Sequence, residues 1–212
     1  LRILLAIGAE GIAVGMSTKV LPHNIRELIE AEILCLEGKP FKLYPDFPSG
    51  GLVDVSEYAD GKGKVLVRAK FDLSDDKRIV IRELPFGSTT ESLIASIEAA
   101  ARSGKIKVSE INDFTAENVE IEIKLQRGVY AADVVDALHA FTECEQSISC
   151  NLLVIKDNYP VVMTVTEVIK DHAKRLVKIL KEELELEKAN LIERLHMRTL
   201  ERIFVEERIY KK

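Results

Sequence analysis

Tryptophan is absent from this 212-residue sequence, and cysteine occurs only three times. No apolar run approaches the ~20 residues that a membrane-spanning helix needs. The cysteines, Cys35, Cys144 and Cys150, form no CxxC pair and leave one unmatched, so neither a disulfide framework nor a zinc site is indicated. We therefore predict buried, reduced thiols in a cytoplasmic protein that does not enter a membrane. The first seven residues include no initiator methionine and no charged signal region, which suggests a fragment of a longer protein.

Metal-binding and nucleotide-binding patterns are also missing. The histidines, His23, His139, His172 and His196, are scattered and include no HxxxH pair. The segment Gly61-Lys-Gly-Lys64 is too short to be a nucleotide-binding loop. We predict neither a metal nor a nucleotide cofactor within this chain.

Charge is unevenly distributed, with a formal net value of −5. Residues 1–70 carry nine basic and nine acidic side chains, residues 71–163 carry nine and sixteen, and residues 164–212 carry twelve and ten. This balance argues against a protein whose whole surface binds nucleic acid. A local nucleic-acid face would lie in the first third, with help from the last third.

Hydrophobic periodicity predicts the secondary structure of residues 1–163. The expected helices cover 25–36, a segment from the capping box Ser88-x-x-Glu91 to Arg102, and 131–141. The expected strands cover 65–73, 79–84, 106–111, 119–125 and 148–155, and Asp157-Asn-Tyr-Pro160 is expected to close the domain. Regular alternation and short links predict an α+β fold with a largely antiparallel sheet and helices on one face.

Residues 164–212 form a second predicted unit, a long C-terminal helix without glycine or proline. A narrow stripe of leucines runs along it: Leu176, Leu180, Leu184, Leu191 and Leu195. Some forty helical residues would extend ~60 Å, farther than this domain could cover. We expect the far half to pack on a partner, although a helix folded back on the sheet is an alternative.

The segment from Gly8 to Asn24 carries the strongest functional pattern. Glycines at 8, 11 and 15 surround Ile12, so the backbone can approach another surface while one large apolar side chain projects. Basic donors for phosphate oxygens follow at Lys19, His23 and Arg26. An apolar wedge beside cations suits insertion between base pairs, whereas a small strand packed in an ordinary core is the alternative. Further candidates for phosphate contacts are Lys62, Lys64, Arg68 and Lys70, although a solvated hairpin end is the favoured interpretation of that segment.

The motifs Gly11-Ile-Ala-Val-Gly-Met16 and Pro22-His-Asn24 closely resemble the opening of the tower domain in A subunits of bacterial type IIA DNA topoisomerases, gyrase and topoisomerase IV. The loop around Pro45-Asp-Phe-Pro48 and the segment Glu83-Leu-Pro-Phe-Gly87 resemble later parts of the same domain. The resemblance implies that Ile12 intercalates into bent DNA and that the long helix begins a coiled-coil arm. Leu21 before Pro22, and the segment 112–118, differ from standard gyrase and favour topoisomerase IV.

The same resemblance implies partners and chemistry beyond this chain. The partners would be double-stranded DNA, a second copy of the A subunit in a homodimer, and a B subunit that carries the Mg²⁺ and ATP chemistry. In the family, a tyrosine beside an arginine in a preceding winged-helix domain attacks DNA, and the five tyrosines here lack that context. We therefore expect the nucleophile upstream of Leu1, an inactive fragment, and an ATP-dependent, chromosome-associated parent enzyme.

A second hypothesis assigns no DNA to this chain. It would be a structural or regulatory α+β module that dimerises through its long helix, as the acidic middle segment and the negative net charge allow.

Overall fold

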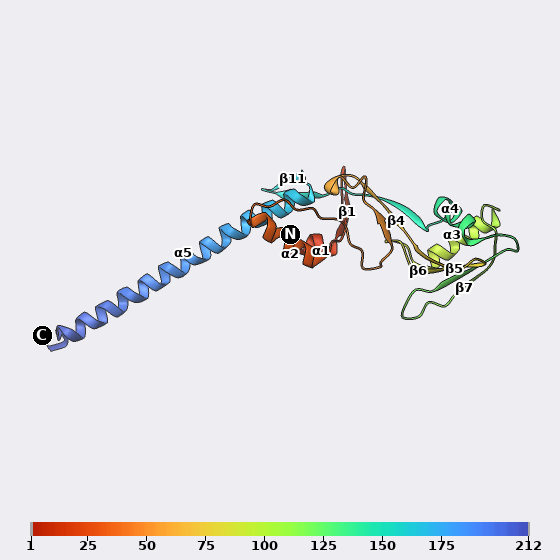
Figure 1. The fold of residues 1–212 in the computed structure, drawn as a ribbon. Coiled ribbons are helices and arrows are strands. Elements are labelled where there is room, and N and C mark those ends of the chain that lie inside the picture. Colours follow the sequence, from red (N-terminus) through yellow and green to blue (C-terminus); the bar gives the residue numbers. More distant parts are fainter. Residues whose placement is uncertain (1, 212) are drawn as a thin grey trace.

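The structure is a computed structural model that describes residues 2–211. Leu1 and Lys212, the outer limits of the two predicted domains, lie outside the described residues. Figure 1 shows an elongated molecule, with a long helix leading away from one end and a four-stranded sheet at the other. The helices are α1 (Arg2–Ile7), α2 (Ile25–Leu36), α3 (Thr90–Arg102), α4 (Ala131–Phe141) and α5 (Val165–Glu206), with 3-10 turns η1 (Ala59–Gly61) and η2 (Ile209–Lys211). The strands are β1 (Ala9–Ala13), β2 (Met16–Val20), β3 (Leu52–Asp54), β4 (Lys64–Arg68), β5 (Lys70–Asp75), β6 (Arg78–Glu83), β7 (Val108–Asp113), β8 (Ile121–Leu125), β9 (Glu145–Ser149), β10 (Leu153–Lys156) and β11 (Tyr159–Val162).

The predicted α+β class with antiparallel strands is confirmed, and the strands divide among separate sheets. β1 pairs with β2, and β10 pairs with β11, as two hairpins. The other two sheets have the orders β3-β4-β9 and β5-β6-β8-β7. Every pair of named strands is antiparallel.

Two of the predicted strands are wrong in extent because each changes partner midway. The predicted strand 65–73 is β4 and β5, which belong to different sheets and meet at the buried Ala69. The predicted strand 148–155 is β9 and β10, with Asn151 between them bridged to Lys19. The alternation of buried and less buried residues continues across the β4–β5 break, because Val65, Val67 and Ala69 are all buried. The periodicity of the sequence alone could therefore not reveal the break.

Two predicted boundaries also change. Asp157 and Asn158 do not close the domain: both have positive φ and form the turn of the β10–β11 hairpin. The capping box of α3 is formed by Thr89 and Ser92, one residue after the predicted pair, because the hydroxyl of Ser88 instead accepts a hydrogen bond from Gln146.

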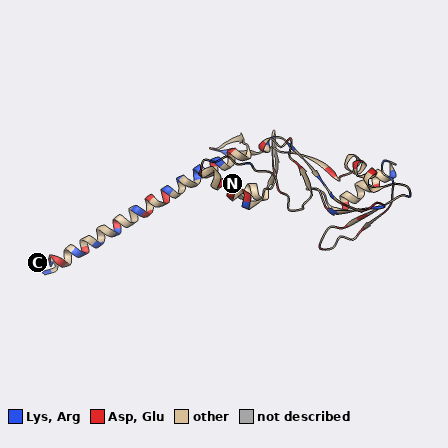
Figure 2. Cartoon of the chain, viewed as in Figure 1, with Lys and Arg blue, Asp and Glu red and all other residues tan. Residues whose placement is uncertain are grey.

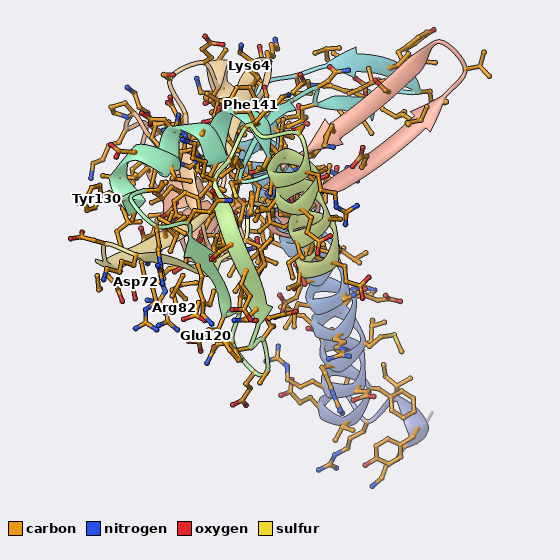
Figure 3. The ribbon with its side chains drawn as sticks, turned by 90° about the vertical axis from the view of Figure 1, so that its right-hand side faces the viewer. Lys64, Asp72, Arg82, Glu120, Tyr130 and Phe141 are labelled. Carbon is orange, nitrogen blue, oxygen red and sulfur yellow. The ribbon has the colours of Figure 1, made fainter. Side chains whose placement is uncertain are left out.

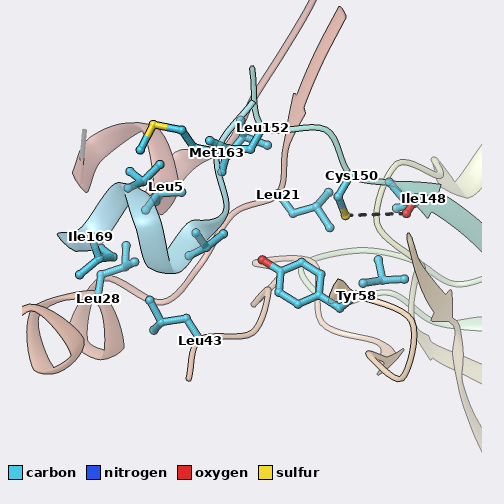
Figure 4. Close-up of a cluster of buried hydrophobic side chains, with 14 of the residues drawn as sticks. Leu5, Leu21, Leu28, Leu43, Tyr58, Ile148, Cys150, Leu152, Met163 and Ile169 are labelled. Carbon is cyan, nitrogen blue, oxygen red and sulfur yellow. Dashed lines mark hydrogen bonds between the residues drawn. The ribbon is translucent and has the colours of Figure 1, made fainter. Parts of the chain in front are cut away.

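The first hydrophobic core joins the β1–β2 hairpin, which carries Ile12, to the first turns of α5 (Figure 4). Leu5 of α1, Leu28 of α2 and Ile169 of α5 are fully buried there. Val165 and Val168 of α5 belong to the same core, which is therefore continuous across the predicted domain boundary at residue 163. That division of the chain stays a prediction.

The second hydrophobic core lies between the four-stranded sheet and the helices α3 and α4. Ile81 and Ile123 of the sheet pack with Leu93 of α3 and Leu138 of α4, and the two helices cover one face of the sheet as predicted. Each core contains a buried free cysteine, Cys150 in the first and Cys144 in the second. Burial raises the pKa of each thiol to about 11, so both are protonated thiols near neutral pH.

Helix α5 begins with a capping box, in which Thr164 and Glu167 exchange side-chain-to-backbone hydrogen bonds of 2.7 and 3.1 Å. The helix ends at Glu206, before the predicted end of the second unit. Beyond Ala173 it leaves the body of the molecule. Its leucine stripe is exposed from Leu180 onward, with Leu195 67 % exposed, whereas Leu176 is partly buried. No helix in the described part of the chain combines the length and apolar character that crossing a membrane requires.

Candidate nucleic-acid interface

The β1–β2 hairpin projects from the body of the protein and presents an apolar tip (Figure 1). Ile12 pairs with Ser17, and Ala13 with Met16, so Val14 and Gly15 make the turn. Gly15 adopts a positive φ of 74°, which this tight connection requires. Ile12 is 87 % exposed and Val14 is 100 % exposed. The predicted projection of Ile12 is confirmed, and its packing into the core of this chain is not observed.

The root of the same hairpin is held firmly. Asn151 accepts a hydrogen bond from the backbone N–H of Lys19 at 2.8 Å and returns one to the Lys19 carbonyl at 3.0 Å. Its side-chain amide donates to the carbonyl of Ser17 at 2.7 Å. Gly8, at the base, has a φ of 78°, and a Cβ there would lie 2.7 Å from the carbonyl oxygen of Val20. The tip is therefore free while its base is fixed, which is the mechanical requirement for a wedge.

His23 is not available to a phosphate group, because the structure places it in the protein interior with only 3 % exposure. Its Nδ1 lies 3.2 Å from the carbonyl of Leu5, which can only accept, so Nδ1 carries the proton. Its Nε2 then accepts from the hydroxyl of Tyr58 at 2.9 Å. Burial lowers the pKa of His23, which favours this neutral form. The sequence-based assignment of His23 to DNA binding is thus replaced by a structural role.

The segments that resemble the topoisomerase tower contact one another in the fold. Asn24 caps α2 by accepting from the N–H of Arg26 at 3.0 Å, and its amide donates to Asp46 in the Pro-Asp-Phe-Pro loop. Phe47 of that loop stacks on Phe86 of the Glu-Leu-Pro-Phe-Gly segment, with ring centroids 4.5 Å apart. These motifs therefore connect the start of α2, the 45–48 loop and the 83–87 segment to one another, next to the base of the β1–β2 hairpin.

The predicted lysines and arginines are exposed except for Lys19, which is partly buried, and most of them form salt bridges with nearby carboxylates. Lys19 pairs with Glu10 at 3.1 Å across the hairpin, Lys62 with Glu167 at 3.8 Å, and Lys64 with Glu57 at 2.9 Å. Arg68 pairs with Glu145, and Lys70 with Glu83. Surface pairs contribute only ~0–1 kcal/mol each, so a phosphate can replace the carboxylate.

The structure brings some of these cations close to the wedge and leaves one apart. The N–H of Cys150 donates to the carbonyl of Gly63 at 2.7 Å, so the 62–64 segment lies beside Asn151 and hence beside the hairpin root. Arg26 is exposed on α2, which lies at the end of the hairpin away from its tip (Figure 1). Arg26 is the weakest of the predicted contacts.

Sequence reasoning missed Asn151 as an anchor of the hairpin. Asn151 and Lys19 are distant in the chain, and their pairing is an isolated bridge outside the named strands. The only local signal is a polar residue that interrupts the apolar pattern of 148–155. Among residues 2–211, no group of three or more histidine, cysteine or acidic side chains is arranged to hold a metal ion.

Comparison with known proteins gives one family. A model of the family formed by the A subunits of DNA gyrase and topoisomerase IV matches residues 1–211. The chain is 59 % identical over 203 residues to the DNA topoisomerase 4 A subunit of Borreliella burgdorferi, covering 96 % of this chain and 32 % of that protein. It is 32 % identical to the DNA gyrase A subunit of Lawsonia intracellularis, covering 92 % and 26 %, and 34 % identical to that of Helicobacter pylori strain 26695, covering 88 % and 25 %. The chain spans a third or less of the length of these relatives.

Proposed function

Because the chain belongs to the family of DNA gyrase and topoisomerase IV A subunits, we propose that it grips and bends the DNA segment that the parent enzyme cleaves. Topoisomerase IV is favoured over gyrase, since the identity to the former relative is 59 % and to the latter two 32 % and 34 %. Ile12 is the side chain that enters the base stack.

The exposure of Ile12 on an anchored hairpin is the observation that carries this proposal. Burial of an isoleucine side chain stabilises a complex by ~1.5–3 kcal/mol. Unstacking one base step costs a few kcal/mol, so burial of Ile12 alone would about offset that cost. The remaining stabilisation must come from phosphate contacts that the bend brings within reach, for which Lys19, Lys62, Lys64 and Arg68 are the candidates.

The rest of the mechanism belongs to the parent protein. We assign its cleavage chemistry to a tyrosine outside this chain, and its Mg²⁺ and ATP chemistry to a B subunit. Two copies of the parent protein would hold one duplex from both sides in the cytoplasm. The role of this chain is mechanical: it holds DNA in a shape that favours cleavage and strand passage.

The test is DNA bending by the chain. A ~30-base-pair duplex carrying a fluorophore at each end is titrated with the unchanged chain, with Ile12→Ala, and with Ile3→Ala as the matched control. Ile3 is 71 % exposed on α1, so its truncation removes the same apolar group away from the hairpin. We expect energy transfer between the ends to rise with the unchanged chain and the control, and to rise much less with Ile12→Ala. Equal bending by all three would contradict the wedge assignment.

A second candidate function is supported by the exposed leucine stripe of α5. Leu184, Leu191 and Leu195 form an apolar surface that a second copy could cover, giving a dimerising module without DNA affinity. Sedimentation of the unchanged chain and of a Leu191→Ser, Leu195→Ser variant separates the two functions. A dimer that these changes dissociate, together with no salt-dependent DNA binding, would favour the module.

A further inference from the structure

A groove lies beside the wedge hairpin, between the β10–β11 hairpin and the root of α5. Its walls are Val161 and Val162 of β11 and one face of α5, with Lys156, Lys170 and Lys174 among the lining residues. The β10–β11 hairpin adjoins the wedge hairpin, because the N–H of Leu153 donates to the hydroxyl of Thr18 at 3.3 Å. Figure 3 shows both hairpins projecting toward the same side of the molecule. A duplex seated on the wedge would therefore pass close to this groove.

A line of lysines leaves the groove along α5. The four members, which we call the lysine track, are Lys170, Lys174, Lys178 and Lys181. Their spacing of four, four and three residues places them on one face of the helix. They span ~16 Å of helix, which matches about five phosphates along one DNA strand. All four are exposed.

The carboxylates near the groove are already engaged. Lys156 forms a salt bridge with Asp171, and Glu167 caps α5 and lies 3.8 Å from Lys62. Within the described part of the chain, neither Lys170 nor Lys174 forms a salt bridge. These two lysines therefore need not give up an ion pair to bind an anion, unlike the cations near the wedge.

The charge of α5 is segregated along its length. Residues 170–181 carry five basic side chains and one acidic side chain, and residues 182–187 carry four glutamates and no basic residue. In Figure 2 the ribbon of α5 is blue, the colour of lysine and arginine, at several positions where the helix leaves the body. A simply solvated helix would mix the two signs. The leucine stripe occupies a different face, so a partner packed on those leucines would leave the lysine track open.

We propose that the lysine track is a second binding site for the phosphate backbone of duplex DNA. The inference rests on the proposed function, that this chain grips DNA on the side of the two hairpins, whether or not Ile12 enters the base stack. The DNA at the track is an outer arm of the duplex that the β1–β2 hairpin holds, because the groove and this hairpin adjoin on one side of the molecule.

The experiment measures DNA affinity of the full chain against salt concentration. Three proteins are compared with the unchanged chain: Lys170→Gln with Lys174→Gln, the matched control Lys188→Gln with Arg194→Gln on the same helix, and Ile12→Ala. Both double variants remove two exposed positive charges. Each protein is titrated with duplexes of roughly 12, 24 and 40 base pairs, and the number of duplexes bound per chain is measured by fluorescence anisotropy with the DNA in excess.

We expect the track variant to weaken binding on the order of tenfold and to lower the salt slope by about 0.9 for each lost phosphate contact. The control should change neither quantity. A loss that appears only with the longer duplexes supports an arm of the hairpin-bound duplex. A loss at every length, with two duplexes bound per chain, would contradict that assignment and place a separate duplex at the track.

The outcomes distinguish the two proposals. If Ile12→Ala weakens DNA binding while the track variant matches its control, the proposed site at the lysine track is wrong and the role of Ile12 as a wedge is supported. If the track variant alone weakens binding, the track stands and the wedge is wrong. Absence of DNA binding by the unchanged chain at low salt would overturn both.

Discussion

The two hydrophobic cores support very different surfaces. The first core anchors elements that reach outward, namely two hairpins and a helix that leaves the body of the molecule. The second core supports a sheet whose outer charges are matched with one another: Arg78 pairs with Glu122 at 3.0 Å, and Arg82 pairs with Glu120 at 3.1 Å. Figure 3 shows Asp72, Arg82 and Glu120 together on that face.

This difference between the cores explains the acidic middle of the sequence. Its excess of carboxylates lies largely on and around the second core, where several are paired across strands. The candidate DNA contacts lie on elements of the first core, so the net charge of the chain says little about them. A local interface is decided by which charges the fold leaves available.

Truncation of a core residue should produce the largest effect and show whether the cores unfold separately. Leu28→Ala in the first core should lower the free energy of unfolding by ~2–5 kcal/mol, because it removes a fully buried side chain and leaves a cavity. Hydrogen exchange should then speed up in α2 and at the root of α5, while amides of β6 and β8 stay protected. Equal loss of protection in both cores would mean that they form one cooperative unit.

The root of the wedge should be more sensitive than its tip. Gly8→Ala combines a φ of 78° with a Cβ 2.7 Å from a backbone oxygen, and should cost about 2–3 kcal/mol of stability. Gly15→Ala has a similar φ but open space around its Cβ, and should cost only about 1 kcal/mol. Urea unfolding curves of the two variants provide the check, and an equal loss would argue against a tightly fixed root.

A histidine whose pKa is lowered by burial lies at each core: His23 is buried at the first, and His139 is partly buried beside the second. The folded state resists protonation, whereas the unfolded chain takes up a proton below its ordinary pKa of 6.5. Stability should therefore be complete above about pH 6.5 and decline as the pH falls below it, toward the folded-state pKa. Carboxylates with lowered pKa, such as Glu83 and Glu122, should matter only below about pH 4.5.

Urea unfolding at pH 7.5 and pH 5.5 measures this decline. His23→Gln and His139→Gln should each reduce the difference in stability between the two pH values, and the double variant should reduce it further. A difference unchanged in the double variant would assign the acid sensitivity to other groups.

The smallest effect is expected on the outer face of the second core. Arg82→Met removes two exposed salt bridges, which should change stability by less than about 1 kcal/mol. DNA affinity should stay unchanged, in contrast to the lysine-track variant. The same anisotropy titration measures this. Reduced DNA binding by Arg82→Met would mean that the DNA interface includes the sheet of the second core, so that the two cores would not differ in DNA binding.

Local sequence determined several elements without help from the rest of the chain. The helices over 25–36 and 131–141 have the predicted bounds, and Thr164 with Glu167 starts α5, because hydrogen bonds within one or two helical turns define them. The projection of Ile12 follows from a tight turn at Gly15 flanked by short strands. Such contacts join residues close in the chain, so their pattern can be recognised directly.

Only the tertiary structure decided which surface each residue faces. Five large apolar residues recur at helical spacing along α2, yet Ile25, Ile29, Ile33 and Leu36 are exposed and only Leu28 is fully buried. His23 looks like a phosphate donor in sequence, yet Leu5 and Tyr58 hold it inside. The strand breaks at Ala69 and Asn151 depend on partners far away in the chain. Periodicity identifies an apolar or polar face, but only long-range packing selects what covers it.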